Sequence, residues 1–129
     1  MAERQHSCGA RLINIGLEPD IADGVGISGV IDCQGKVIIE KDVFSGHDIK
    51  ILTGSHNYFF FGEERKKAGI IKGVHIKEGA WLCTGCIILQ GVTIGKHAVV
   101  GAGSIVTKNI GDYEFWAGNP AKLIKVIPH

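Results

Sequence analysis

One aliphatic residue recurs every six positions along the second half of this chain. The series consists of Ile76, Leu82, Ile88, Ile94, Val100 and Val106, and four positions after each of the first five comes a second small or aliphatic residue: Ala80, Cys86, Val92, Ala98 and Ser104. A period of six matches neither the 3.6-residue period of a helix nor a strand alternation sustained over thirty residues. It indicates a hexapeptide repeat, in which short strands and turns wind into a β-helical solenoid around one core.

A first tract with the same period lies upstream. Its inward positions are Ile21, Ile27, Cys33, Ile39, Ser45 and Ile51, followed four residues later by Val25, Ile31, Val37, Val43, Ile49 and Ser55. The second tract starts at Ile70 and is shifted by one residue against the first. The segment 57–69 is therefore predicted to leave the solenoid as a protruding loop and return.

The protruding loop opens with four aromatic residues, Tyr58 to Phe61, which hold three of the five Phe in the chain. These rings either fold back as a cap on the solenoid, or they cover an active site or contact a neighbouring subunit. At the two ends, residues 1–20 are predicted to form an N-terminal cap, as solenoids require. Residues 110–129 form a turn-rich exit with a terminal strand. We therefore predict a single all-β domain over 1–129.

Composition agrees with short strands and many turns. The chain is 45% hydrophobic but only 7% aromatic, and its 19 Ile and 10 Val against 6 Leu favour strands. A net charge of +1 without a basic face gives no basis for binding nucleic acid. No apolar run is long enough for a membrane span, and residues 1–9 lack the apolar centre of a signal peptide. Four cysteines in such a chain fit a reducing cytoplasm.

The motif Cys83-Thr84-Gly85-Cys86 has the C-x-x-C spacing of some zinc and redox sites. The six-residue register places Cys86 inward and Cys83 outside the inward series. No second C-x-x-C exists in the chain, and a lone motif of this kind is weak. We interpret the pair as structural and expect no metal.

The residues also carry a family resemblance. The segments Gly91–Gly95, Val100–Lys108 and Gly118–Lys122 resemble the hexapeptide-repeat acetyltransferases, and most closely the maltose/galactoside branch and the sugar O-acetyltransferases of polysaccharide gene clusters. The resemblance covers roughly residues 37 to 127. It implies a left-handed parallel β-helix with three hexads per coil, assembled as a homotrimer with active sites between subunits. It also implies acetyl-coenzyme A as co-substrate and a sugar-type acceptor whose identity is open.

Site residues follow from matching positions. The catalytic histidine of the family precedes the protruding loop, and here Thr53-Gly54-Ser55-His56 stands in that place. The resemblance puts the coenzyme against Trp81, Thr84, Ala102, Thr107, Lys108 and Lys122. The polar residue that orients the histidine in the family has no clear match within residues 28–32.

His56 also has an independent chemical case. A neutral imidazole removes the proton of an acceptor hydroxyl as that oxygen attacks a thioester, and its unperturbed pKa lies near working pH. Lysines at 108 and 122 are expected to meet the coenzyme's phosphates as mobile point charges. The alternative for both is plain solubility, which explains Lys122 equally well. Trp81 is either a wall of the acyl pocket or a ring buried between subunits.

Two other functions remain open at the level of sequence. A zinc-dependent carbonic anhydrase on the same solenoid needs three histidine ligands. The separations between His47, His56, His75 and His97, namely 9, 19 and 22 residues, include no tight pair. The other alternative is a catalytically inactive structural β-helix.

Overall fold

The computed structural model describes residues 2–129, in which nearly all regular structure is strand. The elements are β1 (Ala2–Gln5), β2 (Arg11–Ile15), β3 (Asp20–Ile21), β4 (Gly29–Asp32), β5 (Val37–Ile39), β6 (Phe44–Ser45), β7 (Ile49–Ile51), β8 (Gly54–His56), α1 (Gly62–Lys67), β9 (Gly69–Ile71), β10 (Val74–Ile76), β11 (Trp81–Leu82), β12 (Ile87–Ile88), β13 (Thr93–Ile94), β14 (Val99–Val100), β15 (Ile105–Val106), β16 (Glu114–Gly118) and β17 (Ala121–Val126). Within these residues, no helix has the length and apolar character that crossing a bilayer requires.

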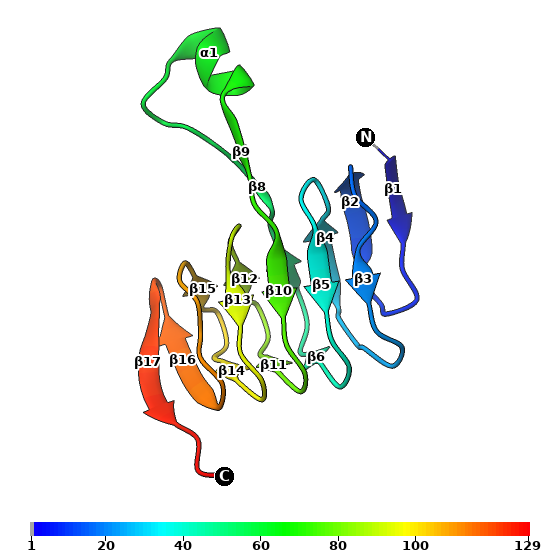
Figure 1. The fold of residues 1–129 in the computed structure, drawn as a ribbon, viewed down its shortest axis with the longest axis vertical. Coiled ribbons are helices and arrows are strands. Elements are labelled where there is room, and N and C mark those ends of the chain that lie inside the picture. Colours follow the sequence, from blue (N-terminus) through cyan, green and yellow to red (C-terminus); the bar gives the residue numbers. More distant parts are fainter. Residues whose placement is uncertain (1) are drawn as a thin grey trace.

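The strands build three mainly parallel sheets. Sheet A has the order β1-β2-β4-β7-β12-β15, sheet B the order β13-β10-β5-β3, and sheet C the order β17-β16-β14-β11-β6. The chain visits sheets B, C and A in turn, as β10, β11 and β12 do before β13, β14 and β15. We call three such consecutive strands a rung. Figure 1 shows the rungs stacked side by side along the molecule.

The six-residue register is confirmed by burial. All six aliphatic residues of the series from Ile76 to Val106 are fully buried, as are Ala80, Cys86, Ala98 and Ser104. In the first tract Ile27, Cys33, Ile39 and Ile51 are buried too, while Ile21 and Ser45 are half-buried. Full burial stabilises each large aliphatic side chain by about 1.5–3 kcal/mol. One continuous core therefore runs between the three sheets.

The one-residue phase shift has a simple geometric origin. Ile76 pairs with Ile94, 18 residues later, but on its other side it pairs with Ile39, 37 residues earlier. The difference between 37 and 18 is 19 residues, which is three hexads plus one. An excursion of that length between two rungs restores the stacking and moves the register by one position.

The excursion leaves the sheets as a hairpin with a helix at its tip. Strands β8 and β9 pair antiparallel, with His56 opposite Gly69, and α1 lies between them in sequence. Figure 1 shows this protrusion standing clear of the stacked rungs. Ile70 lies in β9 opposite Ser55, so its prediction as the first residue of the second tract was wrong. The second tract starts at Val74, which is buried.

The two ends differ from the repeat. At the N-terminus β1 pairs antiparallel with β2, whereas β2 pairs parallel with β4 and buries Leu12 completely. At the C-terminus β16 stacks parallel on β14 and then turns back into the antiparallel β17. This last hairpin brings the chain end against sheet C, where it forms part of the candidate site.

Candidate active site

His56 lies at the end of β8 and is exposed. Its Nδ1 atom is 2.9 Å from the backbone carbonyl oxygen of Arg65 in α1. A carbonyl oxygen only accepts hydrogen bonds, so Nδ1 carries the proton of the neutral ring. The Nε2 atom is then an unprotonated acceptor, which is the form that a general base requires.

The root of the protrusion is held by the buried carboxylate of Asp32, which is only 3% exposed. Its Oδ2 atom accepts hydrogen bonds from the backbone N–H groups of Thr53 and Gly54, each at 3.1 Å, and from the Thr53 hydroxyl at 3.2 Å. Asn14 and Gln34 donate to Oδ1, each at 3.2 Å. The carboxylate therefore fixes the backbone two residues before His56.

Asp32 belongs to the stretch 28–32, where no match for the family's polar residue was evident from sequence. It does not touch the imidazole; it holds the backbone that leads to it. Gly54 permits this close packing, because a Cβ atom there would lie 2.4 Å from Gln34 Nε2. The one feature of the sequence that pointed to Asp32 was its place as an acidic residue directly before Cys33, an inward position.

An apolar groove of about 430 Å³ runs along sheet C and the chain's C-terminal end. Its lining consists of Trp81, Cys83, Val99, Gly101, Ala102, Phe115, Lys125, Ile127 and Pro128. The predicted residues Trp81 and Ala102 both lie here, and the Trp81 ring stacks on Phe44 with centroids 5.8 Å apart. Phe115 and Ile127 were missed, because the sequence places them beyond the end of the repeat.

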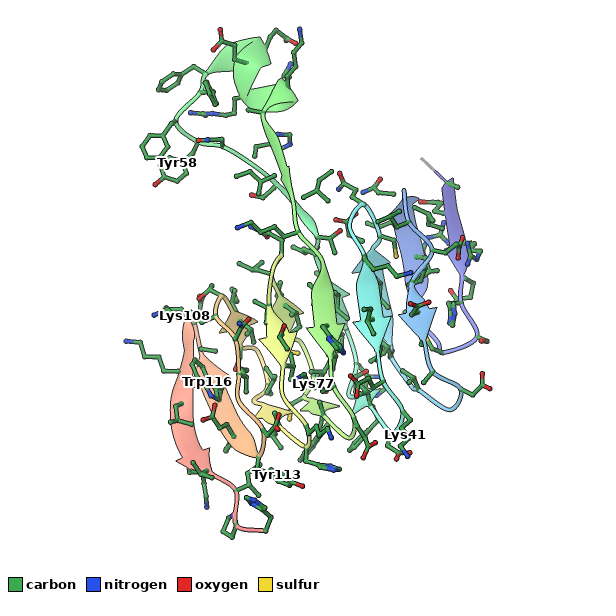
Figure 2. All side chains as sticks on the ribbon, viewed as in Figure 1. Lys41, Tyr58, Lys77, Lys108, Tyr113 and Trp116 are labelled. Carbon is green, nitrogen blue, oxygen red and sulfur yellow. The ribbon has the colours of Figure 1, made fainter. Side chains whose placement is uncertain are left out.

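A second groove, the lysine groove, has a volume of about 180 Å³ and lies where β15 meets the terminal hairpin. It is lined by Thr107, Lys108, Trp116, Pro120, Ala121, Lys122 and Leu123. Figure 2 shows Lys108 projecting at this end of the molecule, above Trp116. Three of the predicted coenzyme residues, Thr107, Lys108 and Lys122, are thus brought together.

Two predicted residues lie outside both grooves. Thr84 sits at a corner of its rung, where its hydroxyl accepts a hydrogen bond from the His47 N–H at 3.2 Å. His56 stands on the protrusion and, within residues 2–129, forms no hydrogen bond with a residue of either groove. A single chain therefore holds the two grooves and the candidate base as separate parts.

The two cysteines of the C-x-x-C motif, Cys83 and Cys86, are poor nucleophiles in this setting. All four cysteines are free thiols. Burial raises the pKa of the Cys86 thiol to about 12, and burial also raises the pKa of Cys83. Thiolate is the reactive form, so both residues are protonated near neutral pH. Cys83 also lines the apolar groove.

The other histidines of the repeats have different surroundings. The Nε2 atom of His75 lies 2.5 Å from a carboxylate oxygen of Glu40, and the His97 ring packs 5.3 Å from that of Tyr113. The described part of the chain contains no cluster of three or more His, Cys, Asp or Glu arranged to hold a metal ion.

Residues 73–108 match the family model described as bacterial transferase hexapeptide (six repeats). The matched residues contain the regular series from Ile76 to Val106, five of the nine residues that line the apolar groove and two of the seven that line the lysine groove. These residues are thus hexapeptide repeats of the bacterial transferase type, and the resemblance to hexapeptide-repeat acetyltransferases is confirmed.

Named relatives support the same family. The chain is 37% identical over 93 residues to a galactoside O-acetyltransferase of Lactococcus lactis, an alignment that covers 70% of this chain and 44% of the relative. The structure resembles a hexapeptide-repeat acetyltransferase of Vibrio cholerae, solved with acetyl coenzyme A, at a TM-score of 0.78 and 26% identity over 86% of this chain and 61% of that one. It also resembles a maltose O-acetyltransferase of Clostridium difficile, at a TM-score of 0.64 and 30% identity over 77% and 56% of the two chains. The alignments span less than half the length of the curated relatives.

Proposed function

We propose that this chain transfers an acetyl group from acetyl-coenzyme A to a hydroxyl (or amine) of a sugar-type acceptor, with His56 as general base. The observation that carries the proposal is the hydrogen bond between His56 Nδ1 and the Arg65 carbonyl, at 2.9 Å. This bond leaves Nε2 as the acceptor atom of an exposed imidazole at the end of β8, within the protrusion. The Lactococcus lactis relative, named a galactoside O-acetyltransferase, supports the acceptor class.

The proposed fold is a left-handed parallel β-helix with three hexads per coil. The 18-residue spacing of stacked partners, such as Trp81 with Val99, supports the coil length. The handedness comes from the family resemblance. The four free thiols fit a reducing compartment, which we propose to be the cytoplasm.

The proposed assembly is a homotrimer with active sites between subunits. His56 and the two grooves lie apart in one chain, so a neighbouring chain would complete each site. The rings of Tyr58, Phe59, Phe60 and Phe61 are 42–75% exposed, and such apolar clusters commonly form contacts between proteins. Figure 2 shows Tyr58 on the protrusion, well away from the core of its own chain.

The residues present fit coenzyme A. Gly101 and Ala102 leave the apolar groove wide enough for a narrow chain such as the pantetheine arm. Lys108 and Lys122 supply positive charge for its phosphates at the other groove. Thr84 joins this proposed set through the resemblance alone.

The mechanism we propose is direct transfer in a ternary complex. Acetyl-coenzyme A supplies a thioester, whose carbonyl carbon accepts the oxygen of the acceptor. The Nε2 atom of His56 takes the hydroxyl proton during the attack and then delivers it to the departing sulfur. A backbone N–H in a glycine-rich turn stabilises the negative charge that develops on the carbonyl oxygen. No acyl-enzyme is needed, since the nearby thiols are held protonated.

The test is His56→Ala, compared with His47→Ala, which removes an exposed histidine from a corner of the repeat. General-base catalysis contributes about 10²–10⁴-fold, so transfer by His56→Ala should fall by that factor. Acetyl-coenzyme A affinity, measured by calorimetry, should stay within about twofold of wild type, because His56 lines neither groove. Transfer at the wild-type rate in His56→Ala would refute the assigned base.

The acceptor itself is found by screening amino sugars, nucleotide sugars and simple glycosides with acetyl-coenzyme A. A protein that binds acetyl-coenzyme A yet acetylates none of them would support the inactive structural β-helix.

A further inference from the structure

Arg65 takes part in several hydrogen bonds inside the protrusion, through both its side chain and its backbone carbonyl. Its guanidinium donates from Nε to the Phe60 carbonyl at 2.6 Å and from Nη2 to the Tyr58 carbonyl at 3.0 Å. The same group lies 4.9 Å from the centre of the Phe61 ring. Its own backbone carbonyl is the acceptor for His56 Nδ1. One residue thus ties the aromatic segment, the helix and the candidate base together.

The protrusion depends on such hydrogen bonds because it has no hydrophobic core of its own. Helix α1 has six residues, none of them buried, and its N-cap residue Phe61 makes no side-chain cap hydrogen bond. Helices this short are marginal in water without tertiary contacts. The Asn57 N–H donates to the Ala68 carbonyl at 3.0 Å and closes the segment at its base, and the Ala68 N–H donates to the Glu64 carbonyl at 2.8 Å at the end of α1.

The geometry of the arginine suits this task. A guanidinium presents several donors in a rigid fork, so it holds two carbonyl oxygens in a fixed relation, whereas a lysine ammonium is a flexible point charge. The Tyr58 and Phe60 carbonyls lie before α1, and the Arg65 carbonyl lies within it. The Arg65 side chain therefore fixes the position of α1 relative to the loop that contains Tyr58 and Phe60. It thereby also fixes the position of the Arg65 carbonyl relative to His56.

We propose that Arg65 is a positioning residue for His56. Its side chain orders the segment 57–68, and its carbonyl then keeps the proton on Nδ1 and leaves Nε2 as the basic atom. The proposal rests on the proposed function of His56. It adds a second residue on which that base depends, one that lies nine positions away and acts only through the imidazole.

Lys66 provides a matched control on the same helix. Its ammonium pairs with Glu63 at 3.0 Å, and both side chains are 75% exposed. Exposed pairs of this kind contribute little to stability. Replacing Lys66 removes one positive charge from α1, as replacing Arg65 does, but leaves the bonds to the Tyr58 and Phe60 carbonyls intact.

The experiment compares Arg65→Gln, Arg65→Lys and Lys66→Gln in the full chain. Hydrogen exchange of the amides from Asn57 to Ala68 reports order in the segment without any substrate. Steady-state kinetics report kcat and the KM for acetyl-coenzyme A. Thermal unfolding reports whether the rungs remain folded in each variant. We expect that they do, because no residue of α1 is part of the core.

For Arg65→Gln we expect faster exchange across 57–68 and a kcat lower by about 10–100-fold, since small misplacement of a catalytic group is costly. The KM for acetyl-coenzyme A and the melting temperature should stay near wild type. Arg65→Lys should recover only part of kcat, because one ammonium cannot reproduce the fork. In Arg65→Gly, millimolar guanidinium ion should restore part of kcat, and Lys66→Gln should match wild type throughout.

Three results would overturn the proposal. An inactive His56→Ala together with a fully active Arg65→Gln would remove the positioning role and leave the proposed function standing. A fully active His56→Ala would remove the proposed function, and the positioning role with it. A loss of kcat in Lys66→Gln as large as in Arg65→Gln would assign the effect to charge and also count against Arg65.

Discussion

At the scale of single residues, His56 differs from the other histidines in which atom is engaged. Its Nδ1 meets a backbone carbonyl, whereas the Nε2 atom of His75 meets the Glu40 carboxylate at 2.5 Å. A carbonyl oxygen accepts a hydrogen bond from one ring nitrogen and leaves the other nitrogen of the neutral ring as an acceptor. At His75 the Nε2 atom donates to the Glu40 carboxylate, and this hydrogen bond lowers the pKa of Glu40. Among the described residues, the Nε2 atom of His75 is engaged by Glu40, whereas the Nε2 atom of His56 has no hydrogen-bond partner.

The thiols give a first residue-scale prediction. The rate of acetyl transfer by Cys83→Ser should stay within about threefold of wild type, because direct transfer forms no covalent bond to the thiol. This holds even though the Cys83 side chain lines the apolar groove. Rapid-quench mass spectrometry should find no acetylated chain at any time in the reaction. An acetyl-enzyme that forms and decays at the turnover rate, and is lost in Cys83→Ser, would replace direct transfer with a two-step route.

Cys86 gives a second prediction, on stability at alkaline pH. Its pKa is about 12 in the folded chain against an ordinary value of 9.0, because burial disfavours the thiolate. For a group whose folded pKa is raised, the stabilisation is fully present below pH 9 and is lost as pH rises through the folded pKa. The free energy of unfolding should therefore fall above pH 9, and Cys86→Ala should show a shallower fall. Parallel slopes between pH 9 and 11 would contradict this.

At the scale of elements, the junction between β7 and the protrusion depends on Asp32. Its carboxylate accepts the Thr53 and Gly54 N–H groups, and Thr53 is fully buried. Asp32→Ala leaves these donors without a partner, at about 1–3 kcal/mol each. We expect the free energy of unfolding to drop by several kcal/mol in denaturant titration. Glu63→Ala, which breaks an exposed pair with Lys66 at 3.0 Å, should cost less than about 1 kcal/mol.

Asp32→Asn tests whether the negative charge matters or only the acceptor atoms. Its amide retains one acceptor oxygen but presents N–H groups where the carboxylate met donors. The stability should lie between those of wild type and Asp32→Ala. Equal stability of Asp32→Asn and Asp32→Ala would mean that neither oxygen is replaceable by a neutral acceptor.

How far the sequence predicts each element depends on the range of the forces involved. The buried series from Ile76 to Val106 was predictable because a solenoid repeats the same local environment every six residues. The protrusion was predictable from the phase shift alone. Asp32, 21 residues before Thr53, was not, because the bond joins neighbouring rungs at an irregular point. Arg65 reads as one charge in a solvated run until α1 is folded against the Tyr58 carbonyl.

The residues that line the grooves were also only partly predictable from the sequence. Lys108 and Lys122 are 14 positions apart, and only the terminal hairpin of β16 and β17 brings them to one groove. Thr84 was placed by resemblance, and in this chain its hydroxyl is engaged with the His47 N–H. Ala102, at a position set by the repeat, lines the apolar groove, and its contact with the coenzyme stays a prediction.

At the scale of the whole molecule, the proposed site is divided between chains, and this can be tested by mixing variants. His56→Ala removes the base, and Ala102→Trp fills the apolar groove of about 430 Å³ with an indole. Each variant alone should be inactive. If a base from one chain meets the groove of the next, randomly mixed trimers should regain about a quarter of the wild-type sites, since each half is intact with a probability of about one half. A site built within one chain would regain nothing. Mixing His56→Ala with the double variant His56→Ala/Ala102→Trp is the control, because no intact base exists in that mixture and its activity should stay at background.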